Sequence, residues 1–170
     1  MKKFLNIVLI ISVTLFCLTA FCFENMKRNS VYYAKHTPHK GGTEPVLMML
    51  GDNLDWIYTP EIEGSKYKFR GGNIVSKFND KGQETDVFYR SSNEDYSYSD
   101  LSEISYTFDK SFKLEDGFTR ECKYIEPKDI DVDELKSKIY VMLKPIIDAQ
   151  SKPRVNLQWL FDIVYKDRFN

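Results

Sequence analysis

A long uncharged apolar run at the start of the chain limits what this protein can be more than any other feature. Residues Phe4–Phe23 (FLNIVLIISVTLFCLTAFCF) carry no charge, and Asn6 is the only strongly polar side chain among them. A helix of this length rises ~30 Å, about the thickness of the hydrocarbon core of a bilayer. Lys2 and Lys3 precede the run, and the positive end of such a segment stays in the cytoplasm. We therefore expect residues 1–23 to place the rest of the chain at the extracytoplasmic face of the cell membrane.

The fate of this segment is open between two outcomes. Leu18 and Ala20 stand at the −3 and −1 positions of a signal-peptidase site, so residues 1–23 can be a cleaved signal peptide. The length equally allows a single retained transmembrane anchor. Lipidation is disfavoured, because Cys17 and Cys22 each follow a phenylalanine rather than a small residue.

The composition of the remainder indicates one domain without disulfides. Removing residues 1–23 from the 170-residue chain leaves 147 residues, enough for one domain with its own core. They carry 22 basic and 25 acidic side chains, which argues against binding to nucleic acid. Cys122 is the only cysteine outside the apolar run, so no intrachain disulfide can form there. We expect residues 24–45 to be a juxtamembrane spacer or loop and residues 46–170 to be a single extracytoplasmic domain.

Alternating apolar residues predict an antiparallel sheet in the middle of the chain. Residues 73–79 and 83–91 flank Asp80-Lys81-Gly82, a hairpin turn with Gly at the turn position. Residues 103–110 alternate, and so do residues 118–125, where Cys122 would be a packed strand residue. Leu114–Gly117 is expected to be the turn between these two strands. Short connections of this kind predict a β-meander.

Helical periodicity appears in the last third. Asp131 can cap a helix, with Glu134 three residues on, and apolar residues recur at spacings of three and four through Ile146. Pro145 should break or kink this helix near Lys144. Asn156 is expected to cap a second helix. The predicted fold class is therefore α+β: an antiparallel meander with C-terminal helices packed on one face, preceded by the N-terminal transmembrane or signal helix.

The segments before the sheet give weaker patterns. Residues 30–36 (SVYYAKH) fit a short strand or the end of the spacer, and residues 37–45 form a Pro- and Gly-rich loop. Residues 46–50 fit one helical turn, and residues 54–59 (LDWIYT) fit a strand.

No residue pattern indicates catalysis. His36 and His39 have a metal-ligand spacing, but zinc needs three or four ligands, so we expect solvated loop histidines. Close acid pairs (Asp52 with Asp55, Glu61 with Glu63) arise by chance among 25 acids. The glycine pairs at 41–42 and 71–72 lack the context of a phosphate-binding loop. We predict that the protein is not an enzyme and uses no cofactor or metal.

Acidic residues alternate with tyrosines in residues 91–109 (SSNEDYSYSDLSEISYTFD). Acidic residues alone usually mark a solvated surface, whereas tyrosine supplies large contact area at protein interfaces. An acidic field also speeds capture of a basic partner. We predict that exposed strand residues here bind a protein partner: Tyr96, Tyr98, Asp100, Glu103, Tyr106 and Asp109. Some of these will be core residues, because Tyr106 shares a strand face with Ile104 and Phe108.

The chain resembles the TipC family of immunity proteins from streptococci and related Gram-positive bacteria. The similar features are the N-terminal MKKFLNIVLIISVTLFCL, the VYYAK stretch just beyond it, and the strand pair around SEISYTFDK and FTRECKY. The resemblance implies a membrane-tethered or exported protein that neutralises a toxin secreted by the type VII route and directed at lipid II. It also implies that one face of the sheet occludes the toxin. An alternative is a generic cell-envelope binding or adaptor protein, and a third is an exported enzyme with an unfamiliar site.

Overall fold

The computed structural model describes residues 2–59, 67–70, 74–91, 95–101 and 103–170. Its elements, in chain order, are α1 (Lys2–Arg28), α2 (Ser30–Ala34), α3 (Pro45–Asn53), β1 (Tyr67–Arg70), β2 (Ile74–Phe78), β3 (Glu84–Arg90), β4 (Tyr96–Asp100), β5 (Ile104–Phe108), β6 (Leu114–Thr119), β7 (Tyr124–Ile125), the 3-10 helix η1 (Pro127–Asp129), α4 (Val132–Ala149) and α5 (Gln158–Phe169). The predicted α+β class is confirmed.

The strands form one seven-stranded sheet in the order β1 to β7, and every neighbouring pair is antiparallel. This is the predicted meander. The hairpin predicted at Asp80-Lys81-Gly82 is confirmed: Asn79 Oδ1 accepts hydrogen bonds from the N–H groups of Lys81 and Gln83, and Gly82 has φ of 73°. The positive φ explains why glycine stands at this turn.

The hairpin between β5 and β6 differs from its prediction. Leu114–Gly117 belongs to β6, and the turn lies four residues earlier, where Asp109 Oδ1 accepts from the N–H groups of Ser111 and Lys113. Phe112 adopts φ of 62° in this turn, yet its ring is fully buried against Phe108. The predicted single strand 118–125 is also interrupted by a turn, which holds Cys122 at φ of 60° and exposed to solvent. The prediction of a packed Cys122 is therefore wrong.

Two short helices precede the sheet and contribute buried residues to the core of the domain. Residues 30–36 begin with α2, and neither a strand nor a spacer describes them, because Val31 and Tyr33 are fully buried. α3 is longer than the single turn expected, and residues 54–57 form turns rather than a strand. The core thus begins well before residue 46, where the domain was expected to start.

The C-terminal helices follow the predicted periodicity. Asp131 Oδ1 accepts a hydrogen bond from Glu134 N–H at 3.0 Å and caps α4. Of the break or kink predicted near Lys144, the break does not occur, because α4 continues through Pro145 to Ala149. The carbonyl that loses its partner to the proline is that of the exposed Val141, where water can replace the missing donor. The cap predicted at Asn156 is wrong: Leu157 is the N-cap residue of α5, and its side chain makes no capping hydrogen bond. Asn156 lies one residue earlier, where its Oδ1 accepts from Gln158 N–H at 2.9 Å.

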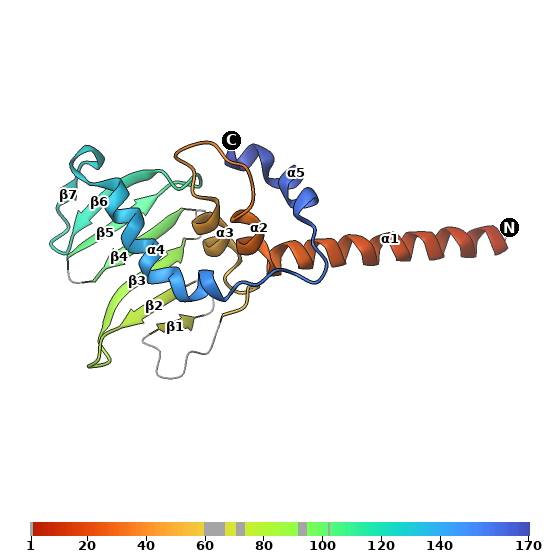
Figure 1. Cartoon of the computed structure of the whole chain (residues 1–170), viewed down its shortest axis with the longest axis horizontal. Coiled ribbons are helices and arrows are strands. Elements are labelled where there is room, and N and C mark those ends of the chain that lie inside the picture. Colours follow the sequence, from red (N-terminus) through yellow and green to blue (C-terminus); the bar gives the residue numbers. More distant parts are fainter. Residues whose placement is uncertain (1, 60–66, 71–73, 92–94, 102) are drawn as a thin grey trace.

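The core lies between one face of the sheet and the layer of helices. Phe88, Tyr96 and Phe108 point toward the helices, and α3 approaches so closely that Gly51 faces the Tyr96 ring. α4 crosses the strands on the same side (Figure 1). Glu44, next to α3, binds both Lys136 Nζ (3.0 Å) and the Tyr140 hydroxyl (2.9 Å) of α4. Among the described residues, no helix covers the other face of the sheet.

α1 projects away from the domain (Figure 1). It is the one described helix long and apolar enough to cross a membrane, and its apolar side chains are exposed along its length. Such a helix fits a membrane anchor or a signal sequence, as its sequence predicts.

Candidate functional site

The six residues predicted to bind a partner do not form one exposed surface. Tyr96 and Tyr98 are 0% and 3% exposed and point toward the helices, so the prediction that they are exposed is wrong. Tyr106 stacks on Tyr98 and is half-buried on the same face. Period-two alternation explains this result, because Tyr96, Tyr98 and Asp100 share one strand face and that face is the core face.

The three acidic residues of that set lie in different surroundings. Asp100 is half-buried and faces Asp86 across the β3–β4 pair, on the helix side of the sheet. Asp109 organises the β5–β6 turn through two backbone N–H groups. Glu103 is exposed, and its N–H donates to Asp100 O in the turn between β4 and β5. Binding of a partner by these carboxylates stays a prediction.

Other sequence candidates are separated in space or lie elsewhere. His36 and His39 are both exposed, and each places Nδ1 within hydrogen-bond distance of a nearby carbonyl oxygen, that of Tyr32 or Thr37. Glu61, Glu63, Gly71 and Gly72 lie outside the described residues. Over the parts of the chain that the structure describes, no group of three or more His, Cys, Asp or Glu side chains could hold a metal ion.

The open face of the sheet presents a row of small and aromatic side chains. Strand register places Val87 opposite Ser99, Ser99 opposite Ser105, Ser105 opposite Phe118, and Phe118 opposite Tyr124. We call these five residues the open-face row. The Ser99 and Ser105 hydroxyl oxygens lie 2.9 Å apart, while Phe118 and Tyr124 make an edge-on ring contact.

This row combines two kinds of contact. Phe118 and Tyr124 are 40% and 53% exposed, so they offer apolar area near the β7 edge. The serines next to them offer hydroxyl groups and leave the sheet backbone close to the surface. Tyr89, Thr107 and Asp116 are half-buried beside it by the same register, and Ser97 between Tyr89 and Thr107 is buried. A shallow polar surface with aromatic edge residues is typical of protein interfaces rather than of enzyme clefts. Sequence alternation could have found this face, had the tyrosines been assigned to the core.

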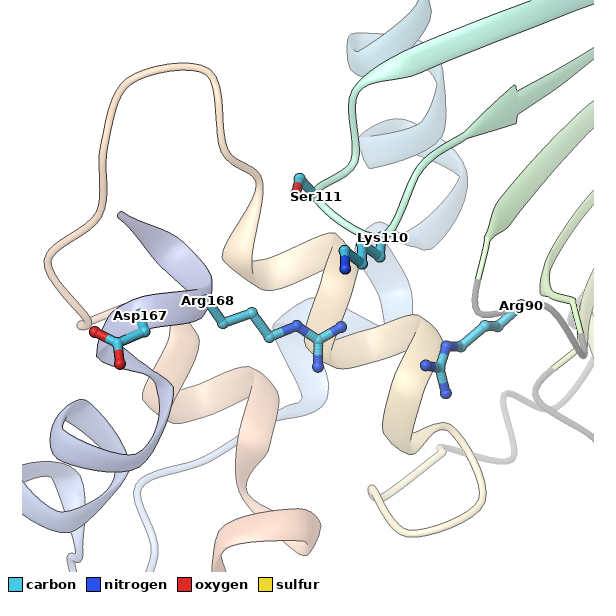
Figure 2. A pocket seen from close by; sticks show the side chains of 5 residues that line it. All are labelled: Arg90, Lys110, Ser111, Asp167 and Arg168. Atoms are coloured by element: carbon cyan, nitrogen blue, oxygen red, sulfur yellow. The ribbon is translucent and has the colours of Figure 1, made fainter.

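A second feature is a cationic pocket of about 470 Å³ at the opposite surface of the sheet, lined by Arg90, Lys110, Ser111, Asp167 and Arg168. The charged ends of Arg168, Arg90 and Lys110 gather around its opening (Figure 2). They come from the end of β3, the β5–β6 turn and the last turn of α5. Beneath them lies Asp52 of α3, whose side chain is only 9% exposed.

The two arginines of the pocket are engaged with Asp52. Arg90 Nε lies 3.1 Å from Asp52 Oδ1, and Arg168 Nη1 lies 2.5 Å from Asp52 Oδ2. The Tyr96 hydroxyl donates to Asp52 Oδ1 at 2.7 Å and accepts from Arg168 Nη2 at 2.8 Å. Burial, together with the Asp52 charge, raises the pKa of Tyr96 above its ordinary value. Burial alone would lower the pKa of Arg168, but Tyr96 and Asp52 outweigh it and raise that pKa.

These contacts make the pocket a structural junction. Each of its two guanidinium groups is used to fasten α5 and β3 to α3, and the lining brings no Cys or His to it among the described residues. The open-face row is therefore the better candidate for a functional surface.

Comparison with known proteins adds no family. The chain matches no protein-family model, no curated protein and no solved structure.

Proposed function

We propose that this chain is a membrane-tethered or exported immunity protein that binds a secreted antibacterial toxin and neutralises it by occlusion. The observation that carries the proposal is a seven-stranded sheet with helices on one face and the exposed side chains of Ser105, Phe118 and Tyr124 on the other. Inhibition would be stoichiometric, with no reaction catalysed by the chain itself. The partner would be a cognate protein toxin, and lipid II the substrate that the toxin is kept from.

The apolar helix supports this function by location. An exposed apolar helix at the N-terminus would hold the domain at the extracytoplasmic face of a Gram-positive cell membrane, where a toxin acting on a lipid-linked precursor must arrive. High local concentration at that surface compensates for a modest interface area. The acidic excess of residues 80–116, which hold ten acidic and four basic side chains, would assist capture of a basic partner.

The partner surface we propose differs from the one expected from the sequence. Tyr96 and Tyr98 are core residues, so the binding face moves to the opposite side of the same strands. Ser105, Phe118 and Tyr124 are the exposed members of the open-face row. Large aromatic groups beside small residues are the usual anchors of a protein interface.

The test is capture of a toxin by the full-length chain in detergent or nanodiscs. The secreted fraction of the producing organism is passed over the immobilised protein and over two variants, Ser105→Arg and Ser137→Arg. Both serines are exposed, but Ser137 lies on α4, which covers the other face of the sheet. One stoichiometric partner, retained by Ser137→Arg and lost with Ser105→Arg, is the expected result.

The alternatives predict other outcomes. Equal capture by both variants would keep the function but refute the open-face row as its surface. If no stoichiometric partner is captured from the secreted fraction, the immunity function is contradicted and a cell-envelope adaptor is the better description.

A further inference from the structure

Exposed aromatic and apolar side chains surround the place where α1 enters the domain. Trp56 is 43% exposed, Val155 is 47% exposed and Trp159 is 63% exposed. The chain has only two tryptophans, and both belong to this group. We call Trp56, Val155 and Trp159 the root patch. Exposed apolar side chains grouped near one place are typical of contact sites for a partner or a membrane.

Hydrogen bonds fix the position of Val155 along the axis of α1, relative to the apolar run of that helix. Asn25 Nδ2 donates to Val155 O at 3.1 Å, and Tyr33 OH donates to Asn25 Oδ1 at 2.7 Å. Leu157 N–H donates in turn to the Tyr33 hydroxyl at 3.0 Å. Asn25 lies two residues beyond Phe23, or ~3 Å along the helix axis. The segment that leads into α5 is therefore held at the end of the apolar run, and Figure 1 shows it passing beside α1.

Trp56 lies at the same level on another side of α1. Lys27 Nζ is 4.6 Å from the centroid of the Phe23 ring and 5.0 Å from that of Trp56. The Lys27 ammonium group thus makes cation–π contacts with both Phe23, the last aromatic residue of the apolar run, and Trp56. Trp159 follows Leu157 by two residues and stands in the first turn of α5. Trp56 is thus tied to α1 through Lys27, and Trp159 lies two residues beyond Leu157, whose N–H is tied to α1 through Tyr33 and Asn25.

The charges around the root patch complement an anionic surface. The flanking segments 23–28, 54–58 and 150–159 contain four basic side chains (Lys27, Arg28, Lys152 and Arg154) and two acidic ones (Glu24 and Asp55). Glu24 is already paired with Arg28 at 2.7 Å. Lys152 and Arg154 are exposed immediately before Val155. Basic residues beside a membrane-inserted segment attract anionic lipids.

We infer that the root patch rests in the headgroup region of an anionic phospholipid bilayer and sets the orientation of the domain on the membrane. Tryptophan favours this region because its ring is amphipathic. Continuity with α1 selects lipid over a protein partner, since the patch begins where the apolar surface of α1 ends. The inference requires α1 to be embedded in a membrane, and it does not depend on toxin binding. It places the β7 end of the sheet away from the bilayer, because β7 lies at the end opposite α1 (Figure 1).

Tryptophan fluorescence tests this directly. The full chain is reconstituted into vesicles of phosphatidylglycerol and phosphatidylcholine that carry bromine on the acyl chains. Trp159→Phe leaves Trp56 as the only indole, and Trp56→Phe leaves Trp159. We expect bromine near the headgroups to lower each emission about twofold, and bromine near the bilayer centre to lower it less. The matched control combines both Phe substitutions with Tyr124→Trp, which places the single indole on β7 and should show no quenching.

Other outcomes overturn the inference. If Trp56 and Trp159 are quenched no more than the indole at position 124, the root patch does not contact lipid. A protein partner would then be the alternative occupant. Lys152→Glu combined with Arg154→Glu should reduce quenching of Trp159 in these vesicles. If Trp159 is quenched equally in this variant and in the parent protein, anionic lipid has no role. The same conclusion follows if the quenching of the parent protein is equal in these vesicles and in vesicles of phosphatidylcholine alone.

Discussion

Arg168, near the end of the chain, forms an ion pair with Asp52 of α3: Nη1 lies 2.5 Å from Oδ2. Arg90, at the end of β3, pairs with the other carboxylate oxygen at 3.1 Å, and the Tyr96 hydroxyl donates to the same atom. One carboxylate thus joins a core helix, the sheet and the C-terminal helix. The Asp52 side chain is largely buried, so water cannot replace it as the counter-charge of the two arginines.

Asp52→Asn should destabilise the protein by about 3 kcal/mol, because two arginines would lose their counter-charge in a poorly solvated site. We place the effect at the lower end of the range for buried pairs, since 31% of the Arg168 side chain stays accessible. Urea unfolding of the full chain in mild detergent, followed by near-ultraviolet circular dichroism, measures it. The control is Asp148→Asn, which breaks an exposed pair with Lys144 and should leave stability almost unchanged, because solvent screens such a pair. Equal effects of the two substitutions would refute the central role of Asp52.

Gly51→Ala should also destabilise, although alanine normally favours a helix by about 0.5–1 kcal/mol over glycine. A Cβ on Gly51 would lie 2.7 Å from Cε1 and 2.8 Å from Cδ1 of Tyr96. Overpacking of this kind costs about 1–3 kcal/mol, so a net loss of about 1 kcal/mol is expected in the same unfolding experiment. Gly41→Ala has no atom within 4 Å of the new Cβ and serves as the control. A more stable Gly51→Ala protein would show that α3 does not pack on Tyr96 this closely.

Stability should fall at alkaline pH because of buried tyrosines, and Tyr98 is the clearest case. Burial and a 2.7 Å hydrogen bond to Asp86 raise its pKa above the ordinary value. A raised pKa in the folded state means that the folded protein holds this proton more tightly. The stabilisation is complete below about pH 10 and is lost as pH rises further.

Tyr98→Phe removes this linkage and the hydrogen bond to a carboxylate. We expect a loss of about 1.5–3 kcal/mol at neutral pH, which narrows as pH rises above about 10. Denaturant melts of the parent and the variant across this range give the difference. A difference that stays constant or widens with pH would contradict a buried, neutral Tyr98.

Much of the fold followed from local sequence rules. The Asp80-Lys81-Gly82 hairpin and the Asp131 cap depend on contacts within a few residues, and both formed as predicted. The meander followed from period-two alternation. These features need no knowledge of the rest of the chain, which is why sequence was enough.

The errors came from tertiary packing. The VYYA residues of α2 favour strands, but Tyr33 is buried against Phe161 in a helix that packs with α3. The β5–β6 turn moved because burial of Phe112 against Phe108 and Tyr96 offsets its left-handed backbone. The face that each strand shows to the helices cannot be chosen from alternation alone, and this misplaced Tyr96 and Tyr98.

Tyr33→Phe should loosen the segment that leads into α5 and carries Trp159. Its hydroxyl donates to Asn25 and accepts from Leu157 N–H, while its ring packs on Phe161 and would remain. Loss of the hydroxyl should cost about 1–2 kcal/mol in unfolding experiments. It should also raise the quenching of Trp159 by aqueous acrylamide in the Trp56→Phe background. Tyr58→Phe, at a tyrosine whose side chain is exposed, is the control and should leave both readings unchanged. If Tyr33→Phe behaves like this control, the hydroxyl does not fasten the segment, and the position of Trp159 must be held by the packing of α5 alone.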